Sequence, residues 1–170
     1  MRAARPWPNV EELVPLYYAA LYRYAFRLTG CNSEAEDLTQ ETFCSAQAKK
    51  SQLRDQGKVK SWLFSILRNE YLHRQRSRRR SGVVSFEDLE DVGQDQSPID
   101  DFPEAEPGKL QESLNRLPED FRTPLILYYF EELSYRDIAD QMEVPIGTVM
   151  SRIARAKEYL RKALAIKPQR

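Results

Sequence analysis

The segment SYRDIADQMEVPIGTVMSRIARAK, residues 134–157, has the pattern of two helices separated by a tight turn. Ser134, with an acid three residues later, is typical of a helix start and predicts a short helix over residues 135–142. Pro145 disfavours a helical backbone just before it, so we expect a turn there and a second helix over about 148–165. This arrangement is a helix-turn-helix, whose second helix can lie in the major groove of DNA.

Helical spacing divides the side chains of this segment between two faces. Apolar and small residues are expected to fill the seam between the helices, namely Ile138, Ala139, Val149 and Ile153. Ser151, Arg152 and Arg155 share the opposite face of the second helix. Upstream, Pro118 suits the first turn of another helix, so residues 109–170 are predicted to form one helical module.

The first half of the chain predicts three further helices. Asn9 can start the first, in which Pro15 is expected to cause a kink or a later start. Ser33, followed three residues later by an acid, predicts a capping box that opens the second helix, through about Lys50. The third runs from about Val59 into a cluster of arginines. Together they predict a small bundle over 9–80 and an all-α chain of two helical domains.

Charge is segregated along the chain, although 26 basic and 26 acidic residues cancel to a net charge of zero. Residues 68–80 hold six arginines and one acid, and residues 146–170 hold seven basic residues and one acid. Between them, residues 81–108 hold nine acids and no Lys or Arg. We interpret the basic blocks as surfaces for an anionic polymer and residues 81–108 as a flexible acidic linker.

Composition disfavours several classes of protein. No apolar run approaches the roughly 20 residues of a membrane-spanning helix, and the first residues lack the apolar core of a secretory signal. With one His, and with Cys31 and Cys44 outside any CxxC spacing, we expect no metal, no cofactor and no catalytic triad. The two cysteines are interpreted as a turn residue and a helix-packing residue of a cytoplasmic, non-enzymatic protein.

Three segments resemble the extracytoplasmic-function (ECF) class of bacterial sigma factors, in the same order and with a linker of similar length. Residues 33–43, SEAEDLTQETF, resemble the region 2 segment that docks on core RNA polymerase. Residues 61–74, SWLFSILRNEYLHR, resemble the helix that recognises the promoter −10 element. Residues 117–157 resemble region 4, which recognises the −35 element.

The resemblance implies a role for particular residues. It assigns polymerase binding, at the coiled coil of the β′ subunit, to Glu34, Asp37, Leu38, Gln40 and Glu41. It assigns contacts with the melted −10 strand to Trp62, Arg68, Asn69, His73, Arg74 and Arg76. It assigns −35 contacts to Thr148, Ser151, Arg152, Arg155 and Lys157. The implied partners are core RNA polymerase, including its β flap, promoter DNA and an anti-sigma factor.

The chain departs from the family pattern at several positions. Ser45-Ala-Gln47 stands where relatives usually have Arg-Ala-Trp, and His73 stands where they have Asp. Met150 replaces an arginine, which removes one DNA contact. Glu143 replaces the turn glycine, and because a left-handed backbone costs a non-glycine residue about 1–2 kcal/mol, a different turn geometry is expected.

Two other functions remain open from the sequence. A stand-alone helix-turn-helix regulator would bind operator DNA without polymerase, but it leaves the acidic segment 33–43 unexplained. A nucleic-acid enzyme or adaptor, such as a nuclease, would need a metal cluster that the dispersed carboxylates do not offer.

Overall fold

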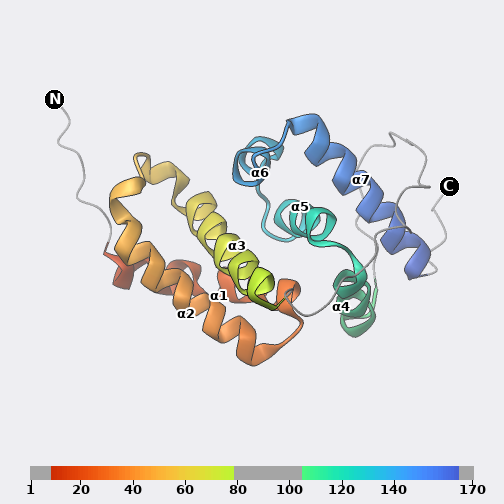
Figure 1. Cartoon of the computed structure of the whole chain (residues 1–170), viewed down its shortest axis with the longest axis horizontal. Helices are drawn as coiled ribbons and strands as arrows, with labels where there is room; N and C mark the ends of the chain where they lie inside the picture. Colours follow the sequence, from red (N-terminus) through yellow and green to blue (C-terminus); the bar gives the residue numbers. More distant parts are fainter. Residues whose placement is uncertain (1–8, 79–104, 165–170) are drawn as a thin grey trace. The chain divides into compact units, whose positions relative to one another are not determined.

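The computed structural model describes residues 9–78 and 105–164, and over these ranges the chain is helical without a strand (Figure 1). It divides into two compact units, each formed mainly by one half of the chain, with Arg27–Gly30 grouped with the second. The predicted all-α fold class is therefore confirmed for the described ranges. The arginines at 79–80, most of the predicted acidic linker and residues 165–170 lie outside them.

The N-terminal unit is a bundle of three long helices. These are α1 (Val10–Thr29), α2 (Asn32–Lys49) and α3 (Val59–Arg78), with two short 3-10 turns, η1 (Lys50–Gln52) and η2 (Gln56–Lys58), between the last two. Helices α2 and α3 pack along each other. The ring of Tyr24 on α1 meets that of Phe64 on α3 at 5.1 Å, and both side chains are fully buried.

Two expectations for the helix starts in this unit are wrong. Pro15 does not delay the start of α1, which begins at Val10 and contains Pro15 as an interior residue. Ser33 does not cap α2, which begins one residue earlier, at Asn32, with Cys31 in the capping position. The Ser33 hydroxyl lies 3.3 Å from the Cys31 sulfur instead.

The C-terminal unit contains four helices, α4 (Pro107–Arg116), α5 (Glu119–Tyr129), α6 (Tyr135–Met142) and α7 (Ile146–Ala163). Helix α7 packs against α4, α5 and α6. The core between them contains fully buried Leu114, Leu125, Ile126 and Leu160. Because α4 begins at Pro107, the last two residues of the predicted linker belong to this unit.

The predicted helix-turn-helix is confirmed in α6 and α7. The Ser134 hydroxyl accepts a hydrogen bond from the Asp137 backbone N–H at 3.1 Å and donates one to its carboxylate at 2.7 Å. Helix α7 begins at Ile146, two residues before the predicted start, with Pro145 as its N-cap. Glu143 ends α6 with φ 54° and ψ 42°, so the turn keeps the left-handed geometry despite lacking glycine.

Candidate functional site

The acidic residues predicted to bind polymerase lie mainly on the outer face of α2. Asp37, Gln40 and Glu41 are exposed, and Glu34 is half-buried. Leu38, by contrast, is 0% exposed and packs in the core, so its side chain supports this face from beneath. Three exposed polar groups from two successive turns therefore form one surface, which we call the acidic face.

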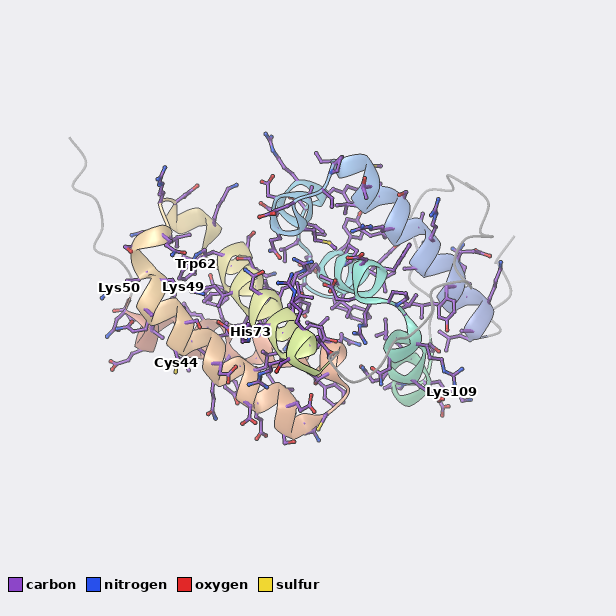
Figure 2. All side chains as sticks on the ribbon, viewed as in Figure 1. Cys44, Lys49, Lys50, Trp62, His73 and Lys109 are labelled. Atoms are coloured by element: carbon purple, nitrogen blue, oxygen red, sulfur yellow. The ribbon has the colours of Figure 1, made fainter. Side chains whose placement is uncertain are left out.

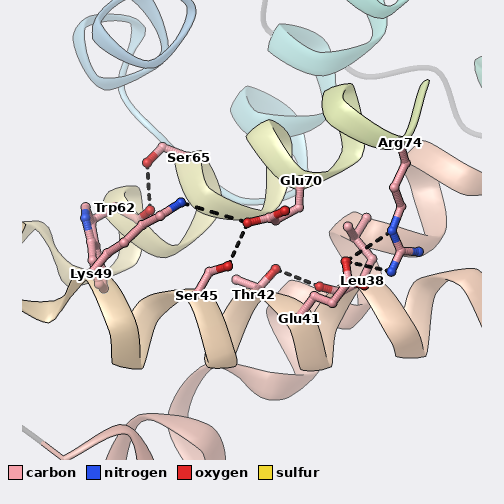
Figure 3. Close-up of polar contacts among 9 residues, drawn as sticks. All are labelled: Leu38, Glu41, Thr42, Ser45, Lys49, Trp62, Ser65, Glu70 and Arg74. Atoms are coloured by element: carbon pink, nitrogen blue, oxygen red, sulfur yellow. Dashed lines mark hydrogen bonds and ion pairs between the residues drawn. The ribbon is translucent and has the colours of Figure 1, made fainter. Parts of the chain in front are cut away.

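Polar contacts join α2 to α3 at two places, the first of them at Glu41 on the acidic face (Figure 3). Arg74 Nη2 lies 2.7 Å from Glu41 Oε2, and Arg74 Nε donates to the same oxygen at 3.1 Å. One turn further along α2, Ser45 donates to Glu70 Oε1 at 2.7 Å, and Lys49 Nζ lies 3.9 Å from that oxygen. Ser45, which departs from the family pattern, thus fixes α2 to α3.

Helix α3 presents one face formed by four of the six residues predicted to contact −10 DNA. Trp62, Asn69, His73 and Arg76 are separated by seven, four and three residues, a spacing that places side chains on one side of a helix. Asn69, His73 and Arg76 are exposed and Trp62 is half-buried. We call this group the α3 face.

The other two residues predicted to contact −10 DNA lie outside the α3 face. Arg74 is held by Glu41 on the side towards α2, and Arg68 is only 9% exposed. Burial of Arg68 indicates that its aliphatic stem contributes to packing. The six predicted residues therefore divide into four on one face and two beside it.

A basic connection between α2 and α3 was missed by the sequence analysis. Residues 49–60 contain five basic side chains and one acid, a net charge of +4, and this stretch includes η1 and η2. Lys50, Arg54 and Lys58 are exposed. Figure 2 shows Lys49 and Trp62 at the same end of the N-terminal unit, so the basic connection adjoins the α3 face. Its charge was visible in the sequence, but its position beside Trp62 required the structure.

The two cysteines occupy different environments. Cys44 is exposed on α2, so its predicted role in helix packing is wrong (Figure 2). Cys31 occupies the N-cap position of α2. A hydrogen bond to Ser33 lowers the pKa of its thiol below the ordinary range, with a further contribution from backbone hydrogen bonds. Neither cysteine forms a disulfide.

The second helix of the helix-turn-helix, α7, buries one side and exposes the other. Ile138, Ala139, Val149 and Ile153 are buried, as the predicted seam requires. On the outer side, Ser151 is exposed, and Thr148, Arg152 and Arg155 are half-buried. The predicted −35 residues other than Lys157 therefore have access to solvent.

Two residues of α7 are tied to the rest of the C-terminal unit. Arg152 Nη2 lies 3.7 Å from Asp120 Oδ2 on α5. Lys157 is 4% exposed, and its Nζ lies 5.6 Å from the centre of the Tyr129 ring. Lys157 thus packs against α5 instead of facing outwards with Arg155.

The described residues contain neither a candidate metal site nor a membrane-spanning helix. Over residues 9–78 and 105–164, no group of three or more His, Cys, Asp or Glu side chains is placed to hold a metal ion. Over the same ranges, no helix is both long enough and apolar enough to cross a membrane.

Two family models match the chain, one for each unit. Residues 13–81 match Sigma-70 region 2, and residues 108–160 match Sigma-70 region 4. These matches coincide with the unit that contains the acidic and α3 faces and with the unit that contains the helix-turn-helix.

Curated proteins are similar over most of the chain. The ECF RNA polymerase sigma factor SigE of Mycolicibacterium smegmatis is 37% identical over 93% of this chain, which spans 62% of that protein's length. The RNA polymerase sigma-H factor of Pseudomonas aeruginosa is 37% identical over 91% of this chain and 85% of its own length.

A solved structure is similar in both sequence and fold. It contains the sigma factor RpoE of Bartonella quintana in complex with the anti-sigma factor NepR. The match covers 93% of this chain and 98% of that one, with 31% sequence identity and a TM-score of 0.74.

Proposed function

The chain belongs to the extracytoplasmic-function family of RNA polymerase sigma factors, and we propose that it binds core RNA polymerase and directs it to promoters. Sigma factors are transcription initiation factors and not enzymes. The observation that carries the proposal is the presence, in one chain, of an exposed acidic face on α2 and a helix-turn-helix with exposed Ser151 and accessible Arg152 and Arg155. We place its action in the cytoplasm, with the polymerase.

We assign polymerase docking to the acidic face. Exposed carboxylates on adjacent turns favour a basic partner, because complementary charge speeds association and fixes orientation. The resemblance identifies that partner as the coiled coil of the β′ subunit. Asp37 and Glu41 supply the charge, while Leu38 contributes by holding α2 in place from beneath. Glu34 lies at the margin of this surface.

We assign the melted −10 strand to the α3 face and the basic connection. Single-stranded DNA is bound by combining cationic grooves with aromatic side chains on which bases stack. Trp62 supplies an aromatic ring, Asn69 and His73 supply polar edges, and residues 49–60 supply positive charge beside them. Arg76 and Arg74 extend this charge along α3, and Arg68 supports the helix from its buried side.

We assign the −35 duplex to α7. In a helix-turn-helix the second helix enters the major groove, where arginine donates to guanine edges. We assign base contacts to Arg155 and Ser151, which are accessible to solvent, and a contact with the DNA backbone to Thr148 at the start of the helix. Arg152 is oriented by Asp120. Because Lys157 is buried, its role is to hold α7 against α5.

The remaining parts of the proposal concern the linker and further partners. Residues 81–108 remain proposed as an acidic connection between domains 9–80 and 109–170, with its last two residues in α4. By resemblance, the C-terminal unit also contacts the β flap of the polymerase. Because the similar RpoE structure contains an anti-sigma factor, we also propose an anti-sigma partner for this chain.

Polymerase docking is tested with two charge-matched double variants. Asp37→Ala with Glu41→Ala removes two charges from the acidic face. Glu11→Ala with Glu12→Ala removes two exposed charges from the first turn of α1. We expect the first pair to weaken binding of labelled protein to core polymerase at least tenfold and the second to change it less than twofold. Equal binding by both double variants would contradict the docking assignment.

A further inference from the structure

Helix α7 exposes an apolar edge beside its cationic one. Ile146 and Met150 are 44% and 45% exposed, and they are two of the four exposed large hydrophobic side chains among the described residues. They lie four residues apart, so they occupy adjacent turns on the same side of the helix. A Cβ atom added at Gly147, between them in sequence, would meet no protein atom within 4 Å, so the surface there is open.

Packing in the core of the C-terminal unit does not explain why Ile146 and Met150 are apolar. The seam between α6 and α7 is already filled by Ile138, Val149 and Ile153, all 0% exposed. Met150 therefore faces outwards from the first turns of α7, where recognition helices contact base edges. Thr148, Arg152 and Arg155 lie towards the other edge of the same outer surface, as their helical spacing requires.

We propose that Ile146 and Met150 recognise the 5-methyl groups of thymines in the −35 element. In the major groove, the thymine methyl is the apolar group that a base presents, and apolar side chains contact it. Two side chains are enough to contact one or two methyl groups. They are too few to form a stable protein–protein interface, which buries a total of about 1,200–2,000 Å². The adjacent arginines supply the positive charge that brings the helix to DNA.

This inference rests on the proposed function, because it takes α7 as the helix that enters the −35 major groove. It goes further by naming the base type that this chain selects at the start of the helix. An arginine at position 150 would favour guanine, whereas Met150 favours a base that carries a methyl group.

The test uses holoenzyme assembled from core polymerase and the full chain. Holoenzyme first selects duplexes from a library randomised across the upstream promoter element. The best site is then remade with each thymine replaced in turn by deoxyuridine, which removes only the methyl group. Binding to each duplex is compared for the wild-type chain, Met150→Ala, Ile146→Ala and the apolar control Met150→Leu.

At one or two positions we expect deoxyuridine to weaken wild-type binding about fourfold, the effect of one methyl group leaving an apolar contact. Met150→Ala or Ile146→Ala should lose this sensitivity at its own position, while Met150→Leu should retain it. The inference is overturned if no thymine is sensitive, or if the alanine variants are as sensitive as the wild type. It is also overturned if Met150→Ala weakens binding to core polymerase without changing base preference.

The same experiment separates this inference from the proposed function. If holoenzyme selects a site but methyl groups have no effect, α7 binds the −35 element through other side chains and only the thymine assignment fails. If holoenzyme selects no duplex at all, the promoter-directing role itself fails, and the thymine assignment fails with it.

Discussion

Glu41 and Arg74, which are assigned to two different partners, are bound to each other, with Arg74 Nη2 2.7 Å from Glu41 Oε2. Glu41 belongs to the acidic face proposed for polymerase, and Arg74 belongs to the helix proposed for −10 DNA. Both side chains retain access to solvent, so the pair contributes at most about 1 kcal/mol to stability. External partners can therefore replace this ion pair with only a small loss of folding stability.

Arg74→Ala is expected to strengthen polymerase binding by up to about fivefold, because Glu41 loses its internal partner and a positive charge beside the acidic face is removed. Fluorescence anisotropy of labelled protein with core polymerase measures the affinity. Arg76→Ala, which removes an exposed charge on the same helix, is the matched control and should have a smaller effect. Weaker polymerase binding by Arg74→Ala would show that the pair does not compete with docking.

Glu143→Gly is expected to stabilise the protein by about 1 kcal/mol, because glycine adopts the left-handed backbone of this turn without the strain that Glu143 bears. Asp140→Gly is the control, since it places glycine at an exposed helical position of α6 and should destabilise by about 1 kcal/mol. Urea unfolding followed by far-ultraviolet circular dichroism measures both. The strain argument fails if the two substitutions shift stability in the same direction.

Lys157→Ala is expected to lower the free energy of unfolding by about 1–3 kcal/mol, because a buried side chain that packs on Tyr129 is truncated. Lys157→Met keeps most of the apolar stem and should restore much of the loss. Arg155→Ala should instead leave stability nearly unchanged and weaken −35 binding by about 1–3 kcal/mol. Thermal melting and DNA binding by holoenzyme distinguish the two roles. If Lys157→Ala is as stable as the wild type but binds DNA more weakly, Lys157 contacts DNA and does not act mainly in packing.

Cys31 is expected to be alkylated by iodoacetamide with a midpoint at lower pH than an ordinary thiol, because the hydrogen bond to Ser33 lowers the pKa of its thiol. As the pH falls, its thiolate fraction should therefore drop to one half at a lower pH than that of an ordinary thiol. Ser33→Ala should move the midpoint upwards. Mass spectrometry of the Cys31 peptide in a Cys44→Ala background follows the reaction. An unchanged midpoint in Ser33→Ala would exclude the hydrogen bond as the cause.

Local patterns predicted the helices well because their determinants are close in sequence. Ser134 and the acid that follows it define the start of α6, and the apolar spacing of Val149 and Ile153 defines the buried side of α7. The cap assigned to Ser33 failed because α2 begins one residue earlier, at Asn32, which places Ser33 inside the first turn. Sequence alone does not show that Cys31 occupies the capping position.

Properties that depend on tertiary packing were harder to predict. Leu38 and Lys157 match family motifs, but their burial depends on neighbouring helices distant in sequence. The Glu41–Arg74 pair joins residues 33 positions apart, and the register between α2 and α3 that brings them together is set by core packing. The geometry at Glu143 was also unpredictable, because the two packed helices impose a backbone that its own side chain disfavours.

The most direct test of the central claim is run-off transcription by purified core polymerase on fragments of the encoding genome, with and without this protein. We predict new transcripts that depend on the protein and begin downstream of one shared pair of −35 and −10 elements. If no such transcripts appear, although the protein alone binds duplex DNA tightly, the chain does not act as a promoter-directing subunit under these conditions and the account is contradicted.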